Sequence, residues 1–410
     1  MKDNQAKYPQ LRFKGFTDPW EQRKFKDNIV SIQTGTNLLG SAVNEGTPLI
    51  KMGNLQRGYF SFKKLEYLDS NSNVGSEDIV NYGDFLFNTR NTLELVGKGA
   101  TWTGISGKYA FNSNIARFKF DGIDTIFFNY LYNTQQVISQ VHARAVGTTS
   151  VSAVYPRDLN SLLYYLPSIE EQKKIGSFFK HLDDTIALYQ RKLDLLKEQK
   201  KGYLQKMFPK NGAKVPELRF AGFADAWEER KLGDVLSERN DQTPETNEYP
   251  LMSFVQGKGV TPKGERYNRS FLVKDSEKKY KKTELGDFIY SSNNLETGSI
   301  GFNRTGKAVI SPVYSIFKSK NSRESQFIGI ISARKDFISK MVRFRQGVVY
   351  GQWRIHESDF LNIDMKMPND KEQQLIISFF ENIDKTIALH QRKLEKLQEL
   401  KKGYLQKMFC

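Results

Sequence analysis

Residues 167–208 read PSIEEQKKIGSFFKHLDDTIALYQRKLDLLKEQKKGYLQKMF, and residues 368–409 repeat this stretch as PNDKEQQLIISFFENIDKTIALHQRKLEKLQELKKGYLQKMF. Aligned without gaps, 26 of the 38 positions in 171–208 are identical to their counterparts in 372–409, far more than chance gives. The chain therefore contains an internal repeat, and the rest of the sequence is arranged around it.

Both copies have the hydrophobic periodicity of a long helix. Largely apolar residues recur at alternating steps of four and three, which is the heptad pattern of a coiled coil. We call these positions the seam, and they predict two matching helices paired as an antiparallel spacer. The alternative is that two unrelated amphipathic helices each pack on their own domain. The predicted pairing residues are Ile175, Phe179, Leu182, Ile186, Tyr189, Leu193 and Leu196, and Ile376, Phe380, Ile383, Ile387, His390, Leu394 and Leu397.

Helix-start and helix-stop signals occur at the same places in both copies. Ser168 with Glu171 fits a capping box, and Asn369 with Glu372 occupies the same positions in the second copy. Each seam is later interrupted by a lysine and a glycine, which predicts an end or a kink in the helix. The sequence leaves open whether the helices continue through these interruptions, which are Lys200 with Gly202 and Lys401 with Gly403.

A second pair of repeats precedes the helices. The segment PQLRFKGFTDPWEQRKF at 9–25 matches PELRFAGFADAWEERKL at 216–232. The complete repeating unit is therefore a leading segment, a globular region and a long helix. The predicted division is a first domain with its leading segment at 1–166, a first long helix at 167–208, a polar linker at 209–215, a second domain at 216–367 and a second long helix at 368–410.

The two enclosed regions, 26–166 and 233–367, differ in sequence but keep a similar order of short β-type segments bounded by Gly, Asn or Pro. GDF occurs in both, at 83–85 and 286–288, and predicts a turn leading into a strand. Helical stretches follow, and we expect them to end at the glycines of 147 and 347. Each region is predicted to be a compact α+β domain with a curved sheet, so the fold class is α+β.

Composition favours an anionic partner. The net charge is +16, from 62 Lys and Arg against 46 Asp and Glu, which favours nucleic acid first and an acidic membrane second. The one cysteine, Cys410, allows no internal disulfide and fits a reducing compartment. The sequence starts without a signal peptide and contains no run of 18 apolar residues. We therefore expect a cytoplasmic protein.

Motifs for catalysis are missing from the sequence. The four histidines, His142, His181, His356 and His390, have no partner at metal-ligand spacing, so we expect no metal site. GISGKY at 104–109 lacks the spacing of a phosphate-binding loop, and neither a dinucleotide fingerprint nor a nucleophile elbow occurs. These observations favour a protein that binds over one that catalyses.

The enclosed regions carry the residue types that read DNA. Arg pairs with guanine and Asn or Gln with adenine in the major groove, whereas Lys and Arg also neutralise phosphates. Segments after the helical stretches, such as 343–354, are expected to press against DNA as loops. The candidate DNA-binding residues are Asn54, Gln56, Arg57, Asn88, Arg90, Asn91, Lys98, Thr148 and Thr149 in the first region, and Gln256, Lys258, Arg266, Asn293, Asn294, Arg304, Arg343, Arg345, Tyr350 and Gln352 in the second.

The duplicated order of these motifs resembles the specificity subunit of a type I restriction-modification system. The resemblance rests on P-x-L-R-F-x-G-F at 9–16 and 216–223, on the repeated GDF, and on KKGYLQKMF at 200–208 and 401–409. It implies that each variable domain reads one half of a bipartite, asymmetric DNA site. It also implies that the paired helices set the spacing and dock two methylation subunits, which hold S-adenosylmethionine and methylate adenine. Motor-nuclease restriction subunits would complete the enzyme, and this chain would hold no cofactor.

Two other hypotheses remain open at this point. The first is that the chain is a self-contained DNA methyltransferase or nuclease with DNA-binding repeats. The second is that it is a coiled-coil scaffold that binds only proteins. The missing cofactor and metal motifs argue against the first alternative. The basic charge and the polar loops argue against the second.

Overall fold

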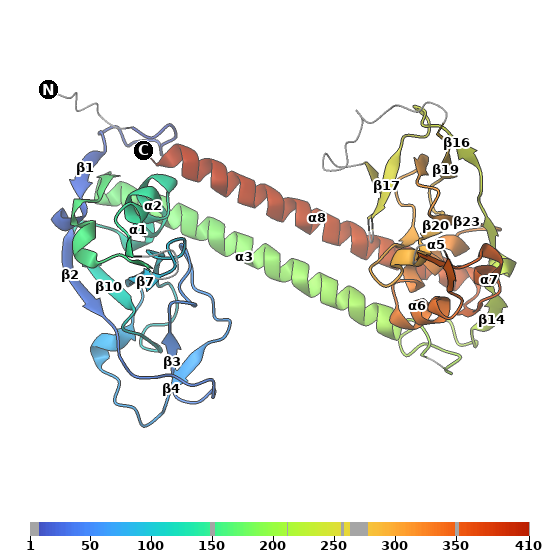
Figure 1. Ribbon diagram of the computed structural model, residues 1–410, viewed down its shortest axis with the longest axis horizontal. Helices are drawn as coiled ribbons and strands as arrows, with labels where there is room; N and C mark the ends of the chain where they lie inside the picture. Colours follow the sequence, from blue (N-terminus) through green and yellow to red (C-terminus); the bar gives the residue numbers. More distant parts are fainter. Residues whose placement is uncertain are drawn as a thin grey trace. The chain divides into compact units, whose positions relative to one another are not determined.

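The computed structural model describes residues 8–147, 152–210, 212–255, 258–262, 278–348 and 352–409. The chain divides into two compact units, and the division runs through both long helices. Unit 1 comprises Met1–Gln190 with Arg392–Cys410, and unit 2 comprises Arg191–Gln391. Each unit therefore holds one α+β domain together with the start of one long helix and the end of the other (Figure 1).

Unit 1 is built on mainly antiparallel sheets, in which β3 and β9 pair in parallel, and on two short helices. One four-stranded sheet has the order β2 (Ile29–Thr34), β10 (Ile115–Phe120), β6 (Phe85–Asn88), β8 (Gly99–Thr101). A second sheet has the order β4 (Glu66–Leu68), β3 (Thr47–Ile50), β9 (Tyr109–Phe111), β5 (Ile79–Val80), and a small sheet joins β11 (Val146–Gly147), β12 (Ser152–Ala153) and β7 (Arg90–Asn91). The helices are α1 (Thr125–Tyr132) and α2 (Gln135–His142).

Unit 2 repeats this plan with different details. Its four-stranded sheet has the order β15 (Leu236–Glu238), β23 (Ser315–Ser319), β20 (Phe288–Tyr290), β21 (Ile300–Phe302), and a three-stranded sheet has the order β16 (Gln242–Thr243), β19 (Tyr280–Thr283), β22 (Ala308–Ile310). Two hairpins are β17 (Met252–Val255) with β18 (Gly259–Pro262), and β24 (Gln346–Val348) with β25 (Gln352–Arg354). The short helices are α4 (Leu232–Val235), α5 (Glu324–Ile331), α6 (Lys335–Val342) and α7 (Glu357–Leu361).

The GDF motif forms the predicted turn into a strand in both units. Gly83 and Gly286 both have a φ of 89°, which glycine adopts without strain, and β6 and β20 begin two residues later. The carboxylates of Asp84 and Asp287 accept hydrogen bonds from backbone N–H groups three residues upstream, at 2.8 and 2.7 Å. The aspartate therefore closes the turn and fixes the start of the central strand.

The prediction that the helical stretches end at the glycines of 147 and 347 is wrong. The helix α2 ends at His142 and α6 at Val342, and both glycines lie in the strands β11 and β24 that follow. Each stretch is two short helices separated by a turn. The residues after the second helix of each pair form short hairpin strands. These strands are too short for a hydrophobic pattern in the sequence to predict them.

Each leading segment adds a strand next to the long helix of its own repeat. The strand β1 (Glu21–Lys24) pairs with β13 (Leu163–Leu166), and β14 (Glu228–Lys231) pairs with β26 (Asp364–Met367). The long helices α3 (Ile169–Lys206) and α8 (Asp370–Met408) begin directly after β13 and β26.

Both long helices continue through their glycines, so neither helix ends there. A side chain at Gly202 or Gly403 would meet no atom within 4 Å, so close packing does not require glycine there. One glycine inside a helix costs about 1 kcal/mol. The residues that follow pack into hydrophobic cores, where Met207 and Met408 are buried, and this packing outweighs that cost.

The arginine of each LRF motif clamps the start of the long helix. Arg12 donates two hydrogen bonds of 2.7 Å to the carboxylate of Glu171, and Arg219 does the same to Glu372. Both carboxylates are fully buried, so each needs this paired, bidentate partner.

The predicted capping boxes are therefore only half formed. Ser168 Oγ accepts the N–H of Glu171 at 3.4 Å, and Asn369 Oδ1 accepts that of Glu372 at 3.0 Å. The glutamate side chains do not reach back to the cap, because the arginines hold them. A capping box is a local motif, and here a contact distant in sequence replaces half of it.

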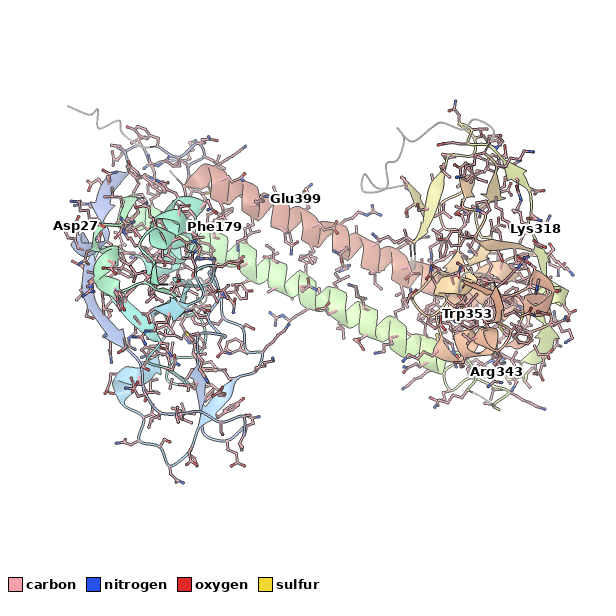
Figure 2. The ribbon with its side chains drawn as sticks, in the orientation of Figure 1. Asp27, Phe179, Lys318, Arg343, Trp353 and Glu399 are labelled. Atoms are coloured by element: carbon pink, nitrogen blue, oxygen red, sulfur yellow. The ribbon has the colours of Figure 1, made fainter. Side chains whose placement is uncertain are left out.

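The hydrophobic core of each unit is completed by the end of the other repeat's helix. In unit 1, Phe409 packs at 6.2 Å from Trp20 and 5.6 Å from Phe127, measured between ring centroids. In unit 2, Phe208 packs at 6.0 Å from Trp227 and 5.7 Å from Phe327. Figure 2 labels Phe179 of α3, whose ring lies 5.8 Å from that of Phe409.

The leading segments also cap these helix ends. The N–H of Leu11 donates to the carbonyl of Lys407, and the N–H of Leu218 donates to the carbonyl of Lys206, both at 2.9 Å. Carbonyls in the last turn of a helix have no partner within the helix, so an external donor satisfies them. The LRF motif thus contacts both the start of one long helix and the end of the other.

Within each unit the two long helices run antiparallel. All fourteen predicted pairing residues are buried or half-buried, and those nearest the helix starts, such as Ile175 and Ile376, belong to the core of their own unit. His390 is half-buried and its Nδ1 lies 2.9 Å from the carbonyl of Thr386. The facing pairs are Phe178 with Tyr404 (5.2 Å between ring centroids) and Tyr189 with Lys393 (4.6 Å from centroid to Nζ) in unit 1, and Tyr203 with Phe379 (4.9 Å) in unit 2.

Candidate nucleic-acid interface

Asn54 builds the loop after β3 and has no free amide for DNA. Its side chain is 3% exposed, its Oδ1 accepts the N–H of Lys51 at 3.0 Å, and its Nδ2 donates to the carbonyls of Ser61 and Lys63 at 3.0 and 3.4 Å. We predicted a readout residue at this position, and the structure shows a buried structural one. Amide side chains serve both purposes, and sequence alone does not separate them.

The same loop gathers basic groups that the sequence placed far apart. The Arg57 cluster consists of Gln56, Arg57, Lys98 and His142. Lys98 Nζ donates to Gln56 Oε1 at 2.8 Å, and Arg57 Nη2 lies 2.8 Å from His142 Nε2. Two cationic side chains and an imidazole thus meet where the loop after β3 approaches the end of α2.

Burial and mutual repulsion disfavour the charged forms of this cluster, and the carboxylate of Glu94 offsets only part of the fall in the pKa of Lys98. Burial lowers the pKa of Lys98, and the nearby guanidinium of Arg57 lowers it further. The pKa of His142 is lowered by burial first and by Arg57 second, and burial lowers the pKa of Arg57 itself. An anion would stabilise such groups, but Lys98 is only 9% exposed, so the half-buried Arg57 and His142 are the members of the cluster open to a partner.

The end of β6 holds three of the predicted residues in different environments. Asn88 is fully buried and its Oδ1 accepts the N–H of Arg90 at 3.2 Å, so it shapes the backbone and does not reach DNA. Arg90 and Asn91 form β7, which pairs with Ala153 and Ser152 of β12. Arg90 is exposed, whereas Asn91 is half-buried.

In unit 2, three predicted residues are occupied by contacts within the protein. Arg304 Nη1 lies 2.8 Å from Asp384 Oδ2, and Arg345 makes two hydrogen bonds of 2.6 Å to Glu296. Asn293 Oδ1 accepts the N–H of Trp353 at 2.6 Å. These side chains position the elements of unit 2, and a DNA contact would have to compete with the ion pairs.

Four of the predicted residues remain well placed for a partner. Arg90, Lys258, Asn294 and Arg343 are exposed. None of the four makes a side-chain hydrogen bond or ion pair with the part of the chain that the structure describes. Figure 2 labels Arg343, which follows the last turn of α6. These side chains are the best candidates for contacts to phosphate or to base edges.

The other predicted residues cannot be placed. Thr148, Thr149, Gln256, Arg266 and Tyr350, and the side chain of Gln352, lie outside the described residues. They stay predictions.

The predicted list of DNA-binding residues omits His142 and Trp353, although the segment 343–354 that contains Trp353 is expected to contact DNA. His142 was considered only as a metal ligand, and its position beside Arg57 depends on a contact across 85 residues of sequence. Trp353 lies in β25 and is 48% exposed. The sequence shows a tryptophan next to an arginine in a short β-type segment, but its exposure is visible only in the structure.

Within the described residues, no group of three or more His, Cys, Asp or Glu side chains is arranged to hold a metal ion. Among the same residues, no helix is both long enough and apolar enough to cross a membrane.

Comparison with known proteins gives a consistent result. The family model of the type I restriction modification DNA specificity domain matches residues 17–198 and 224–399. A putative type I restriction enzyme MjaX specificity subunit from Methanocaldococcus jannaschii is 22% identical over 94% of this chain and 91% of its own length. The type I restriction enzyme MjaVIII specificity subunit of the same organism is 21% identical over 87% of this chain and 86% of its own.

A solved structure shares the fold. The S subunit of a type I restriction-modification system from M. genitalium aligns with a TM-score of 0.62 and 13% identity, covering 98% of this chain and 99% of that one. At this identity the match concerns the fold alone.

Proposed function

Because the chain belongs to the family of type I restriction-modification DNA specificity domains, of which it carries two copies, we propose that each unit reads one half of a bipartite, asymmetric DNA site. The chain is the DNA-targeting component, and its two halves present different side chains to DNA. Half-sites read by two different domains give an asymmetric target.

One observation carries this proposal. The repeated frame, which is the leading segments at 9–25 and 216–232 with the long helices, makes the same contacts in both units. Arg12 holds Glu171 and Arg219 holds Glu372 with the same geometry. The surfaces supported by this frame differ, since the Arg57 cluster occurs in unit 1 and the β24–β25 hairpin carries its own residues in unit 2. A constant frame with different surfaces is what two domains need if they bind DNA in the same way but recognise different half-sites.

The long helices set the distance between half-sites in this proposal. A helix of 38 residues, the length of α3, spans about 57 Å at 1.5 Å per residue. Half-sites one duplex turn apart are separated by roughly 34–36 Å. The intervening bases are spanned without being read.

The chain acts with partners and is itself non-catalytic. Two methylation subunits dock on the repeated frame, hold S-adenosylmethionine and methylate adenine, and motor-nuclease subunits complete the restriction enzyme. The exact repetition of the frame supports this, because two identical partners need the same contact surface twice.

Exchange of residues 26–166 for the corresponding domain of another family member tests the proposal. Methylated adenines are mapped in cells that express the exchanged chain with its partner subunits. We expect one half of the site to change and the other to stay the same. A change in both halves, or in neither, contradicts independent reading.

Insertion of four residues after Lys197 tests the role of the helices. We expect a longer spacer between unchanged half-sites, or loss of assembly. An unchanged site with full activity rules out spacing by the helices. Methylation of DNA by the purified chain with S-adenosylmethionine alone would instead show that the chain is itself an enzyme.

A further inference from the structure

Trp353 is unlike the other three tryptophans of the chain. Trp20, Trp102 and Trp227 are 3%, 1% and 3% exposed, whereas Trp353 is 48% exposed. Tryptophan combines a large apolar ring with a polar N–H and is enriched at binding interfaces, so an exposed one is a candidate contact. Figure 2 labels Trp353 in unit 2.

Contacts hold the backbone of Trp353 in place. Trp353 pairs with Gly347 across the hairpin, and its N–H donates to Asn293 Oδ1 at 2.6 Å. Two residues later, the N–H of Ile355 donates to Ser292 Oγ at 3.0 Å, and the side chain of Ile355 is fully buried. The hairpin is therefore anchored to the turn that contains Asn293 and Asn294, two of the predicted readout residues.

Two acidic groups near the hairpin are paired with arginines. Glu296 binds Arg345 and Glu357 lies 3.6 Å from Arg354, whereas Asp359 accepts a hydrogen bond of 3.4 Å from the neutral amide of Gln346. These pairs leave Arg343 as an exposed cation without such a partner in the described chain. Repulsion of a DNA backbone by free carboxylates is thereby reduced.

Unit 1 has no counterpart of this side chain. The position that pairs with Gly147, as Trp353 pairs with Gly347, is occupied by Ser152, which is 1% exposed. The residue two positions on, Val154, is fully buried, as Ile355 is. The two hairpins thus match in register and differ in the residue presented.

This difference identifies the kind of partner. A surface that binds two identical protein subunits must occur in both units, as the repeated frame does. Trp353 occurs in one unit only, so it belongs to the surface that differs between the half-sites. The chemical group that an exposed indole on an anchored strand recognises in DNA is the face of a base.

We infer that Trp353 stacks its indole on a base of the half-site read by unit 2, at a base step that is opened in the complex. This inference rests on the proposed function and adds a specificity-determining residue to it. In an intact duplex the base faces are covered by their neighbours, so the indole must enter as a wedge, and apolar wedges of this kind kink and unstack DNA. The half-site read by unit 1 is contacted without such a wedge.

Tryptophan emission of the whole chain, with its partner subunits where they are needed for binding, tests the inference. Three tryptophans are buried, so acrylamide quenching reports mainly on Trp353. We expect a duplex containing the mapped site to quench the emission and to protect the indole from acrylamide, and a Trp353→Phe chain to lack this signal. We also expect permanganate to oxidise a thymine at the opened step when the half-site has one there.

Affinity measurements give the second readout. Loss of one stacked base weakens binding about five- to 150-fold, so Trp353→Ala is expected to bind the mapped duplex at least about fivefold more weakly, and Trp353→Phe within about threefold of wild type. The matched control is Val313→Ala, which removes another exposed apolar side chain of unit 2, 63% exposed, and should leave affinity unchanged. Equal unfolding midpoints show that the variants are folded.

The outcomes separate the inference from the proposed function. The wedge is overturned if Trp353→Ala binds the mapped duplex as tightly as wild type and if acrylamide still reaches Trp353 in the wild-type complex. The proposed sequence-specific binding would stand in that case. Protection of the indole by partner subunits without DNA also overturns it. If wild type itself prefers no sequence, the proposed function fails.

Discussion

Lys401 Nζ lies 2.5 Å from Asp183 Oδ1, which joins the end of α8 to α3 within unit 1. In unit 2, Lys200 forms the equivalent ion pair with Asp384. The lysines are the residues at which the heptad seam is interrupted. Each lysine faces an aspartate on the other long helix. The ion pair therefore determines which residues of the two helices lie opposite each other. A polar pair inside an apolar seam fixes the register of paired helices.

Removing this carboxylate should destabilise unit 1 more than removing an exposed one. Asp183 also accepts a hydrogen bond from the hydroxyl of Tyr130 at 2.9 Å. We expect Asp183→Asn to lower the free energy of unfolding by about 1 kcal/mol in urea, because Lys401 loses its partner in a half-buried position.

The control for this experiment is Asp184→Asn. Asp184 pairs with Lys180 one turn away on the same helix, and its side chain is 64% exposed. Its loss should cost less than about 0.5 kcal/mol. If both variants lower the free energy of unfolding equally, the ion pair between the helices contributes no more to stability than the exposed pair.

The Arg12–Glu171 ion pair should contribute more to the free energy of unfolding than the Lys401–Asp183 pair. The Glu171 side chain is fully buried, so Arg12→Ala leaves a buried carboxylate without its cation, which costs about 3–5 kcal/mol. The double variant Arg12→Leu with Glu171→Leu removes both charges and should recover most of this loss. Urea unfolding gives the free energy of unfolding of both variants. If the double variant is no more stable than Arg12→Ala, an unpaired buried charge is not the cause of the loss of stability.

The helix ends should stabilise the unit whose core they enter. Phe409→Ala is expected to cost about 3–4 kcal/mol and to speed hydrogen exchange in α1, because Phe409 packs on Phe127. Phe208→Ala is the matched variant and should act on α5 instead, since Phe208 packs on Phe327. Exchange that rises equally in both helices with either variant would argue against separate cores.

His142 should make stability depend on pH. Its pKa is lowered in the folded protein from about 6.5 by burial, with a smaller contribution from Arg57. Below pH 6.5 the unfolded chain therefore takes up the proton first, and stability falls with falling pH. Urea unfolding of wild type and His142→Gln between pH 8 and pH 5 should show the stability difference shifting in favour of the variant as pH falls. Parallel curves would contradict this.

Repeats and periodicity predicted the frame well because they depend on local pattern. The heptad pattern and the duplicated motifs predicted two long helices, and GDF predicted a turn into a strand in each domain. The LRF motif was recognised as repeated, but its role was not, since Arg12 meets Glu171 across 159 residues of sequence. No local signal reports such a contact.

The candidate interface was predicted less well for the same reason. Asn54, Asn88 and Arg304 have the right chemistry for DNA, yet the first two are buried and the third pairs with Asp384. Residue type states what a side chain can bind, and burial decides whether it is free to do so. Trp353 shows the converse, because only its exposure distinguishes it from the three core tryptophans.

The sequence by itself determined the tandem repeat, the two long helices, the α+β class and the family resemblance, because each is written in patterns that short stretches carry. Only the tertiary structure decided that the helices continue through Gly202 and Gly403, and that Phe208 and Phe409 complete the cores of the units. A single glycine weakens a helix by about 1 kcal/mol. Burying the aromatic residue beyond it gains more, and that gain comes from partners distant in sequence.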